Sequence, residues 1–303
     1  MSSKLFANNF HQEPKVIWLL RILTFAVFAG RGWQHLFWDA PFRTILWDES
    51  ILKPLVESIS DLTWNEYVTS EVIDLRIQIF IKALGVCYLI LAILSLLIKS
   101  SHKKSGYLLI VGTSFLTLLA LLYFKEKFFQ VGQFFEYSAQ FITPLLLYIS
   151  LYSKVEVRKF TFLIKVAIAL TFICHGLYAA GFYPRPGNFV DMTINILGVS
   201  ETSAHTMLWY AGIIDFIVAI AIFIPFVDKA ALIYAVIWGF STSIARVWAN
   251  FDVDFTLLSL HQWLFETVFR LPHGGLPLLI LFLEGVYTSK LFKHRFVAES
   301  TTS

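Results

Sequence analysis

The sequence is poor in charge. Only 15% of its 303 residues are Asp, Glu, Lys or Arg, whereas 57% are hydrophobic and the mean hydropathy is +0.68. A soluble globular domain usually has about 25% charged residues, so this composition argues against one. The net charge of +3 reflects the distribution of Lys and Arg among loops, and it does not indicate nucleic-acid binding.

Cysteine and the common catalytic motifs are also scarce. Cys87 and Cys174 both fall in apolar runs and form no CxxC or metal-thiolate spacing, so we expect neither disulfide chemistry nor a metal site. The sequence has no phosphate loop, dinucleotide fingerprint, zinc signature or nucleophile elbow. Whether the protein is an enzyme is left open by these absences. Its polar N-terminus shows no cleavage site, so no removable signal peptide is expected.

Long hydrophobic runs, by contrast, are abundant. A membrane-spanning helix needs roughly 20 mostly apolar residues, and eight segments meet this requirement. The predicted spans are Val16–Trp38, Ile77–Ile98, Gly106–Phe124, Phe128–Tyr152, Phe160–Tyr183, Thr206–Val227, Ala230–Asn250 and Gln262–Thr288. Pro272 and the pair Gly274-Gly275 are expected to break the last one.

The loops between these spans predict an orientation. With the N-terminus inside, Lys and Arg gather in the cytoplasmic segments, including the N-terminal Lys4 and the C-terminal Lys290, Lys293 and Arg295, and are sparse in the outer loops. The excess of positive charge on the cytoplasmic side predicts that both termini are cytoplasmic. We therefore expect a multi-pass membrane protein in contact with the lipid bilayer. Our leading hypothesis places it in the inner membrane of a bacterium.

Two similar halves follow one another. The segment from Arg21 to Gly32 is similar to the segment from Lys165 to Gly176. Likewise, Gly85-Val-Cys-Tyr88 aligns with Gly212-Ile-Ile-Asp215. Helices near the ends of the halves also match. Glu136-x-x-x-Gln140 in the first half corresponds to Glu266-x-x-x-Arg270 in the second. Four spans per half is an even number, so the halves form a parallel repeat. The predicted fold is an all-α membrane protein of two four-helix bundles, residues 1–153 and 154–303.

The first outer loop, residues 39–74, distinguishes the halves. It is rich in Asp and Glu and also has apolar residues, which predicts short amphipathic helices on the outer surface. Ser60-Asp61, and Ser200-Glu201 in the second half, are candidate N-caps for the helices that follow them. This acidic loop is also the predicted contact surface for protein partners.

Charged and polar residues inside the spans are the candidate site, because such residues are costly in a membrane and usually have a function. Depth counted along each helix places them in a layer in the outer half of the bilayer. The candidate ligand-binding residues are Arg31, Glu136, His175, Asp215, Arg246, Glu266 and Arg270.

These charged residues could form ion pairs in several ways. Glu266 and Arg270 are four residues apart on one helix face and could form an ion pair. That pair is either purely structural or part of a pocket in which Arg270 binds an anionic or carbonyl group. Glu136 could pair with Arg31 or Arg21. Asp215 could meet Arg246 or His175.

Several histidines, among them His35, His175, His205, His261 and His273, fall near the outer side. Imidazole could relay protons to a quinone, and two facing histidines could ligate a haem. No pair has a ligand spacing such as HxxxH, so a haem is the weaker expectation. The alternative is that these histidines lie at the interface or are hydrogen-bonded within the protein.

The repeated unit resembles the DoxX-like membrane family. The residues that match are Lys165, His175-Gly176 and Gly212-Ile-Ile-Asp215, together with the segment 187–198. In the first half Arg21 and Gly32 match, but Arg31 and Tyr88 stand where His175 and Asp215 stand in the second. The resemblance covers most of the chain as two copies. It implies four-helix units and a quinone-linked role, and it puts any chemistry of the first half in doubt.

These observations lead to one leading hypothesis and two alternatives. The leading one is a membrane subunit of a redox complex that binds a quinone or another lipophilic ligand. The first alternative is a non-enzymatic anchor or assembly subunit that acts through the acidic loop. The second is a transporter of small solutes or lipids, although the polar layer is confined to the outer half.

Overall fold

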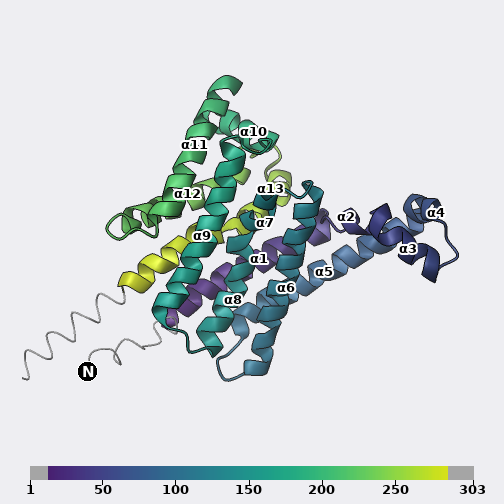
Figure 1. Ribbon diagram of the computed structural model, residues 1–303, viewed down its shortest axis with the longest axis horizontal. Coiled ribbons are helices and arrows are strands. Elements are labelled where there is room, and N and C mark those ends of the chain that lie inside the picture. The colour runs from purple at the N-terminus through teal and green to yellow at the C-terminus, as the bar shows by residue number, and fades with distance from the viewer. Residues whose placement is uncertain (1–12, 286–303) are drawn as a thin grey trace, which may run out of the picture.

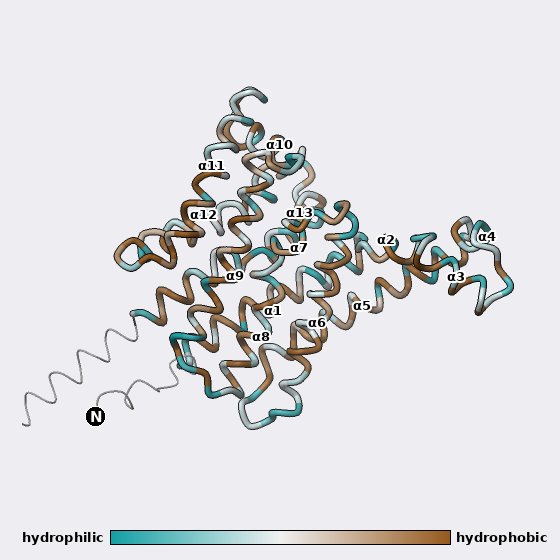
Figure 2. Tube along the Cα trace, in the orientation of Figure 1, coloured by the Kyte–Doolittle hydropathy of each residue, from teal (hydrophilic) through white to brown (hydrophobic). Residues whose placement is uncertain are grey.

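The computed structural model describes residues 13–285, and all the regular structure in that range is helical. Six of its helices are long and apolar enough to cross a membrane. They are α1 (Pro14–Phe37), α5 (Glu71–Leu97), α6 (Lys103–Glu126), α9 (Val157–Ala179), α11 (Glu201–Ala221) and α12 (Asp228–Trp248). Figure 2 shows that hydrophobic residues dominate these helices. The prediction of a helical membrane protein is confirmed at this level.

The other two predicted spans are each divided into two helices. The segment Phe128–Tyr152 contains α7 (Val131–Glu136) and α8 (Ser138–Tyr152), which meet at Tyr137. The last span contains α13 (Thr256–Arg270) and a second helix over residues 272–285. That break lies directly before Pro272, where the missing backbone N–H and the ring interrupt the helix. Residues 286–288 of this predicted span, and Lys4, Lys290, Lys293 and Arg295 of the orientation argument, lie outside the described residues.

The loop at residues 39–74 forms three short helices. They are α2 (Arg43–Leu46), α3 (Glu49–Ile59) and α4 (Trp64–Thr69), and α3 and α4 project beyond the N-terminal end of α5 (Figure 1). Arg43 ties this loop to α5 through Asp74, at 2.7 Å. Hydrogen bonds from Lys125, Ser50 and the backbone N–H of Ile51 lower the pKa of the Asp48 carboxyl to about 2, with that from Lys125 the largest cause. The loop is therefore anchored at its base, whereas the α3–α4 hairpin stands free of the bundle.

One of the two predicted helix caps is wrong. Ser60 is the C-cap of α3, and Thr63 caps α4 in a reciprocal capping box with Glu66. The box satisfies two backbone N–H groups that would otherwise lack partners at the start of the helix. Ser200 caps α11 as predicted, accepting from the backbone N–H of Ser203.

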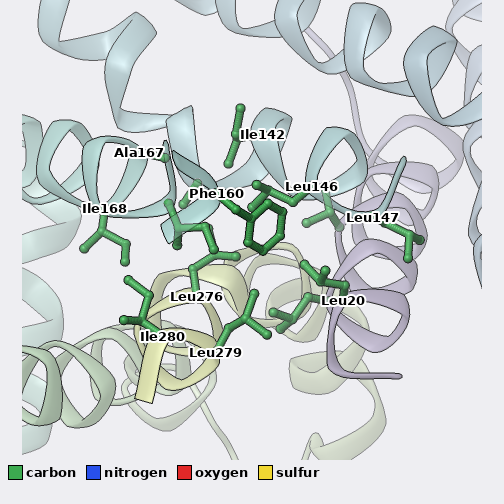
Figure 3. Packing of buried hydrophobic residues seen from close by; sticks show 14 of the residues in the cluster. Leu20, Ile142, Leu146, Leu147, Phe160, Ala167, Ile168, Leu276, Leu279 and Ile280 are labelled. Atoms are coloured by element: carbon green, nitrogen blue, oxygen red, sulfur yellow. The ribbon is translucent and has the colours of Figure 1, made fainter. Parts of the chain in front are cut away.

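The centre of the molecule is a single apolar core. Side chains from α1, α8, α9 and residues 272–285 interdigitate there, among them Leu20, Leu146, Phe160 and Leu276 (Figure 3). The helices around this core expose large apolar side chains, such as Ile90 and Ile93 of α5 and Ile217 and Ile220 of α11. Exposed apolar surface of this extent is expected of helices that face lipid.

Two pairs of glycines bring neighbouring helices close together. A Cβ atom on Gly85 of α5 would lie 3.1 Å from the carbonyl oxygen of Gly32 on α1. A Cβ atom on Gly212 of α11 would lie 2.8 Å from that of Gly176 on α9, and 2.6 Å from the backbone nitrogen of Ala180. Glycine permits this backbone contact, which is a common way of packing helices in lipid.

We predict that Gly212→Ala destabilises the protein, because the added methyl group meets backbone atoms that cannot move aside. Overpacking of this kind costs roughly 1–3 kcal/mol, which thermal unfolding in detergent would detect. Gly187→Ala is the matched control, because a Cβ atom there meets nothing within 4 Å. Equal melting temperatures for the two variants would contradict the prediction.

Candidate functional site

An open-sided cavity of about 440 Å³ lies in the second half, bordered by α9, α11, α12 and the short helix α10 (Gly187–Leu197). Most of its wall is apolar. The apolar wall includes Ala179, Met192, Ile196, Leu208, Ile244 and Trp248. Cavities with apolar walls and a few convergent polar groups are the usual binding sites for small molecules.

One end of this cavity is polar. It is formed by His175 of α9, Asp215 of α11, Arg246 of α12, and Arg270 and His273 around the break before Pro272. Four buried atoms there have no hydrogen-bond partner among the described residues: His175 Nε2, Asp215 Oδ1, Arg246 Nε and His273 Nε2. A buried polar atom without a partner costs about 1–3 kcal/mol. Four such atoms at the end of one cavity indicate a site for a ligand that supplies the missing hydrogen bonds.

The glycines and hydroxyls of the helices bring these side chains together. Gly239 lets α12 approach the start of the last helix so closely that a Cβ atom there would lie 2.5 Å from the carbonyl group of His273. Thr267 of α13 donates to the carbonyl oxygen of Ser243, at 2.7 Å, and Ser243 donates to that of Arg270, at 3.1 Å. Arg246 and Arg270 therefore face the same space from two helices.

Glu266 is shared by these two arginines. Its Oε2 atom lies 3.1 Å from Nη1 of Arg270 and 3.6 Å from Nη1 of Arg246. The predicted pair Glu266–Arg270 is thus present, but with a second cation attached. One carboxylate holds two guanidinium groups, so part of their hydrogen-bonding capacity is left for another acceptor.

Glu136 contributes to this site from the first half of the chain. Its Oε1 atom lies 3.5 Å from His175 Nε2, and its Oε2 atom accepts a hydrogen bond of 3.4 Å from Gln133. Neither suggested partner of Glu136 is found, because Arg21 donates to backbone carbonyls at the end of α5. Arg31 is bound to glutamines instead. Glu136 is thus a neighbour of the cavity rather than of the first helix.

Arg31 lies in a separate environment. It is almost fully buried, with Nη2 and Nε donating to Gln140 Oε1 at 2.6 and 3.1 Å and Nη1 donating to Gln34 Oε1 at 2.7 Å. Its guanidinium carbon lies 3.8 Å from the ring centroid of Phe269. Amides and cation–π contacts stabilise this cation, and the described residues include no carboxylate within ion-pair distance of it.

Of the seven residues predicted from the sequence, four line the cavity: His175, Asp215, Arg246 and Arg270. Glu266 contacts Arg246 and Arg270, Glu136 contacts His175, and Arg31 does not join them. The suggested ion pairs of Asp215 with Arg246 or His175 are not found among the described residues, although all three lie at the same end of the cavity.

Two further residues of the site are not among the seven candidate ligand-binding residues, although His273 is one of the histidines predicted near the outer side. His273 lies with its ring centroid 5.5 Å from that of His175, and its Nδ1 atom is 2.6 Å from the carbonyl oxygen of Arg270. Phe189 of α10 lies nearly parallel to the His175 ring, at 6.1 Å, and 5.6 Å from the guanidinium carbon of Arg246. His273 follows Glu266 and Arg270 at spacings of seven and three residues, a periodicity that could have pointed to it.

The described residues include no cluster of three or more His, Cys, Asp and Glu side chains that could hold a metal ion. Cys174 is buried and Cys87 is exposed, and both are free thiols.

No protein-family model, curated protein or solved structure matches this chain. The function of this chain is therefore inferred from the geometry of the cavity and its polar residues.

We predict that Glu266→Gln destabilises the protein, because it leaves two partly buried arginines without their shared carboxylate. Breaking a buried ion pair costs roughly 3–5 kcal/mol, and partial exposure of Glu266 reduces the expected loss to about 2 kcal/mol. Glu201→Gln is the control, since its side chain is 77% exposed. Equal unfolding midpoints in chemical denaturation of the two detergent-solubilised variants would rule out this role of Glu266.

Proposed function

We propose that this chain binds a lipophilic ligand of the quinone class in the second-half cavity and serves as a membrane subunit of a redox complex. The observation that carries the proposal is the convergence of four unpartnered polar atoms at one end of an apolar cavity. A quinone has a flat head with oxygen atoms and an apolar tail. The head suits the polar end of the cavity, and the tail suits its apolar wall.

The aromatic residues at the cavity support a flat head group. Phe189, Trp238 and Trp248 all line it, and Phe189 already packs against His175 and Arg246. Offset-stacked contacts between a ring and such side chains contribute about 0.5–1.5 kcal/mol beyond the area that they bury. The arginines supply donors for a carbonyl oxygen.

We also propose that the chain is a duplicated four-helix unit with eight membrane crossings and both termini in the cytoplasm of a bacterial cell. The Gly32–Gly85 contact of α1 and α5 corresponds to the Gly176–Gly212 contact of α9 and α11. The cations near the start of the two equivalent helices differ in their partners. Arg21 binds backbone carbonyls of α5, and Lys165 binds Asp228 at 3.1 Å.

The duplication would explain why the site lies in the second half. Matching the two halves places Tyr88 at the position of Asp215, Leu119 at that of Arg246 and Phe115 at that of Thr242. Tyr88 packs against Phe115 and His35, with ring centroids 6.2 and 5.0 Å away. The matched positions of the first half thus have apolar or aromatic side chains where the second half has polar ones.

We predict that Arg246→Leu weakens binding of a decyl-tailed quinone by at least about ten-fold, because a hydrogen bond from a charged donor contributes about 1.5–3 kcal/mol. Quenching of tryptophan fluorescence during titration of the detergent-solubilised protein would measure it. Arg76→Leu is the control, because Arg76 is exposed on α5, away from the cavity. Undetectable binding to the wild-type protein, or equal binding to both variants, would refute the proposed site.

A second candidate function is supported by the α3–α4 hairpin. Ile51, Leu55 and Ile59 of α3 form an exposed apolar stripe at intervals of four residues, and Ile59 is 74% exposed. Acidic residues such as Glu57 and Asp61 lie beside it. Under this proposal the chain is an assembly subunit whose hairpin contacts another protein of a larger complex.

If the hairpin is a contact surface, then Leu55→Ser with Ile59→Ser will reduce recovery of co-purifying proteins from native membranes. Arg270→Ala, which alters the cavity, will leave recovery unchanged. Quantitative mass spectrometry of affinity-purified samples would compare the two. The reverse pattern would reject the assembly role and leave the ligand-binding proposal standing.

A further inference from the structure

The tautomer of His273 is determined by its backbone contact. Its Nδ1 atom lies 2.6 Å from the carbonyl oxygen of Arg270. A carbonyl oxygen only accepts hydrogen bonds, so Nδ1 bears the hydrogen. In the neutral ring, Nε2 is then an acceptor, and this atom is buried at the polar end of the cavity without a partner.

His175 is the second imidazole at this end of the cavity. Its Nε2 atom lies 3.5 Å from the carboxylate of Glu136 but forms no hydrogen bond among the described residues. His273 is therefore the ring whose backbone contact leaves a buried acceptor that needs a hydrogen-bond donor.

Arg246 has the opposite requirement. Its Nε atom is buried without a partner, and a guanidinium group only donates. A head group that satisfies this end of the cavity must accept from Arg246 and donate to an imidazole. A carbonyl oxygen can do only the first, whereas a hydroxyl group can do both.

We propose that the cavity prefers the hydroxyl-bearing, reduced form of its ligand, a quinol, over the corresponding quinone. This inference rests on the proposed function and adds the oxidation state of the ligand. A site built to bond a hydroxyl group rejects the analogue that lacks it, because its own polar groups are then left unpaired. We expect the dissociation constant of the quinol to be at least about ten-fold lower than that of the quinone.

This preference would alter the redox behaviour of the bound ligand. Tighter binding of the reduced form raises the reduction potential of the bound couple. For a two-electron couple, a ten-fold preference corresponds to about 30 mV. The site would retain the quinol in preference to the quinone.

The preference can be tested without redox chemistry by using para-decylphenol and para-decylanisole. Both have one ring, one oxygen and the same tail, but only the phenol donates a hydrogen bond. We expect the wild-type protein to bind the phenol about ten-fold more tightly, and anaerobic titration with decyl-quinol and decyl-quinone to show the same order. Equal affinities for phenol and anisole would overturn the preference while leaving the lipophilic site intact. Failure of every probe to bind would overturn both.

The variant His273→Asn links the preference to one atom. Asparagine can still donate to the carbonyl oxygen of Arg270 but lacks the Nε2 acceptor. Phenol affinity should fall about ten-fold while anisole affinity stays unchanged, so that the discrimination disappears. His102→Asn, in an exposed loop on the opposite side of the protein, should keep the wild-type discrimination. An equal fall for both probes in His273→Asn would indicate structural damage and overturn the role of His273.

Discussion

The carboxylate of Glu266, shared by Arg246 and Arg270, is the interaction on which the cavity depends. Two guanidinium groups inside a membrane repel each other, and lipid offers them neither water nor counterions. A single acid between them makes their proximity tolerable, but it cannot satisfy all ten of the N–H donors that two guanidinium groups present. Glu266 therefore stabilises the two arginines, and some of their N–H groups remain available to donate to a ligand. If each arginine had a carboxylate of its own, fewer N–H donors would remain for a ligand.

Both halves of the chain build the site, although the cavity lies in only one. Glu136, with Gln133 behind it, reaches His175 from α7. The break at Tyr137, which separates α7 from α8, divides the predicted fourth span immediately after Glu136. The break before Pro272 similarly separates Arg270 from His273. Interruptions of two helices thus lie beside the residues that give the cavity its polar end.

Much of the fold could be predicted because apolar runs of sufficient length have few alternatives in a membrane. The sequence also predicted the polar layer, since charges within apolar runs are rare. Apart from the pair Glu266–Arg270, four residues apart on one helix, it could not predict which charges meet. Arg31 and Arg246 look equivalent as isolated cations in spans, yet one is enclosed by amides and rings and the other faces a cavity. That difference depends on contacts with distant helices, and the role of α10 in covering the cavity depends on loop geometry that no periodicity encodes.

Phe269 lies between the two environments. Its ring centroid is 3.8 Å from the guanidinium carbon of Arg31 and 4.7 Å from that of Arg270. The same π-system thus faces one cation from the first half of the chain and one from the second half, which lines the cavity. Substitutions in the two halves of a chain usually act independently. Here a substitution that moves the ring would change the surroundings of both arginines at once, so selection would act on the two halves as a single heritable unit.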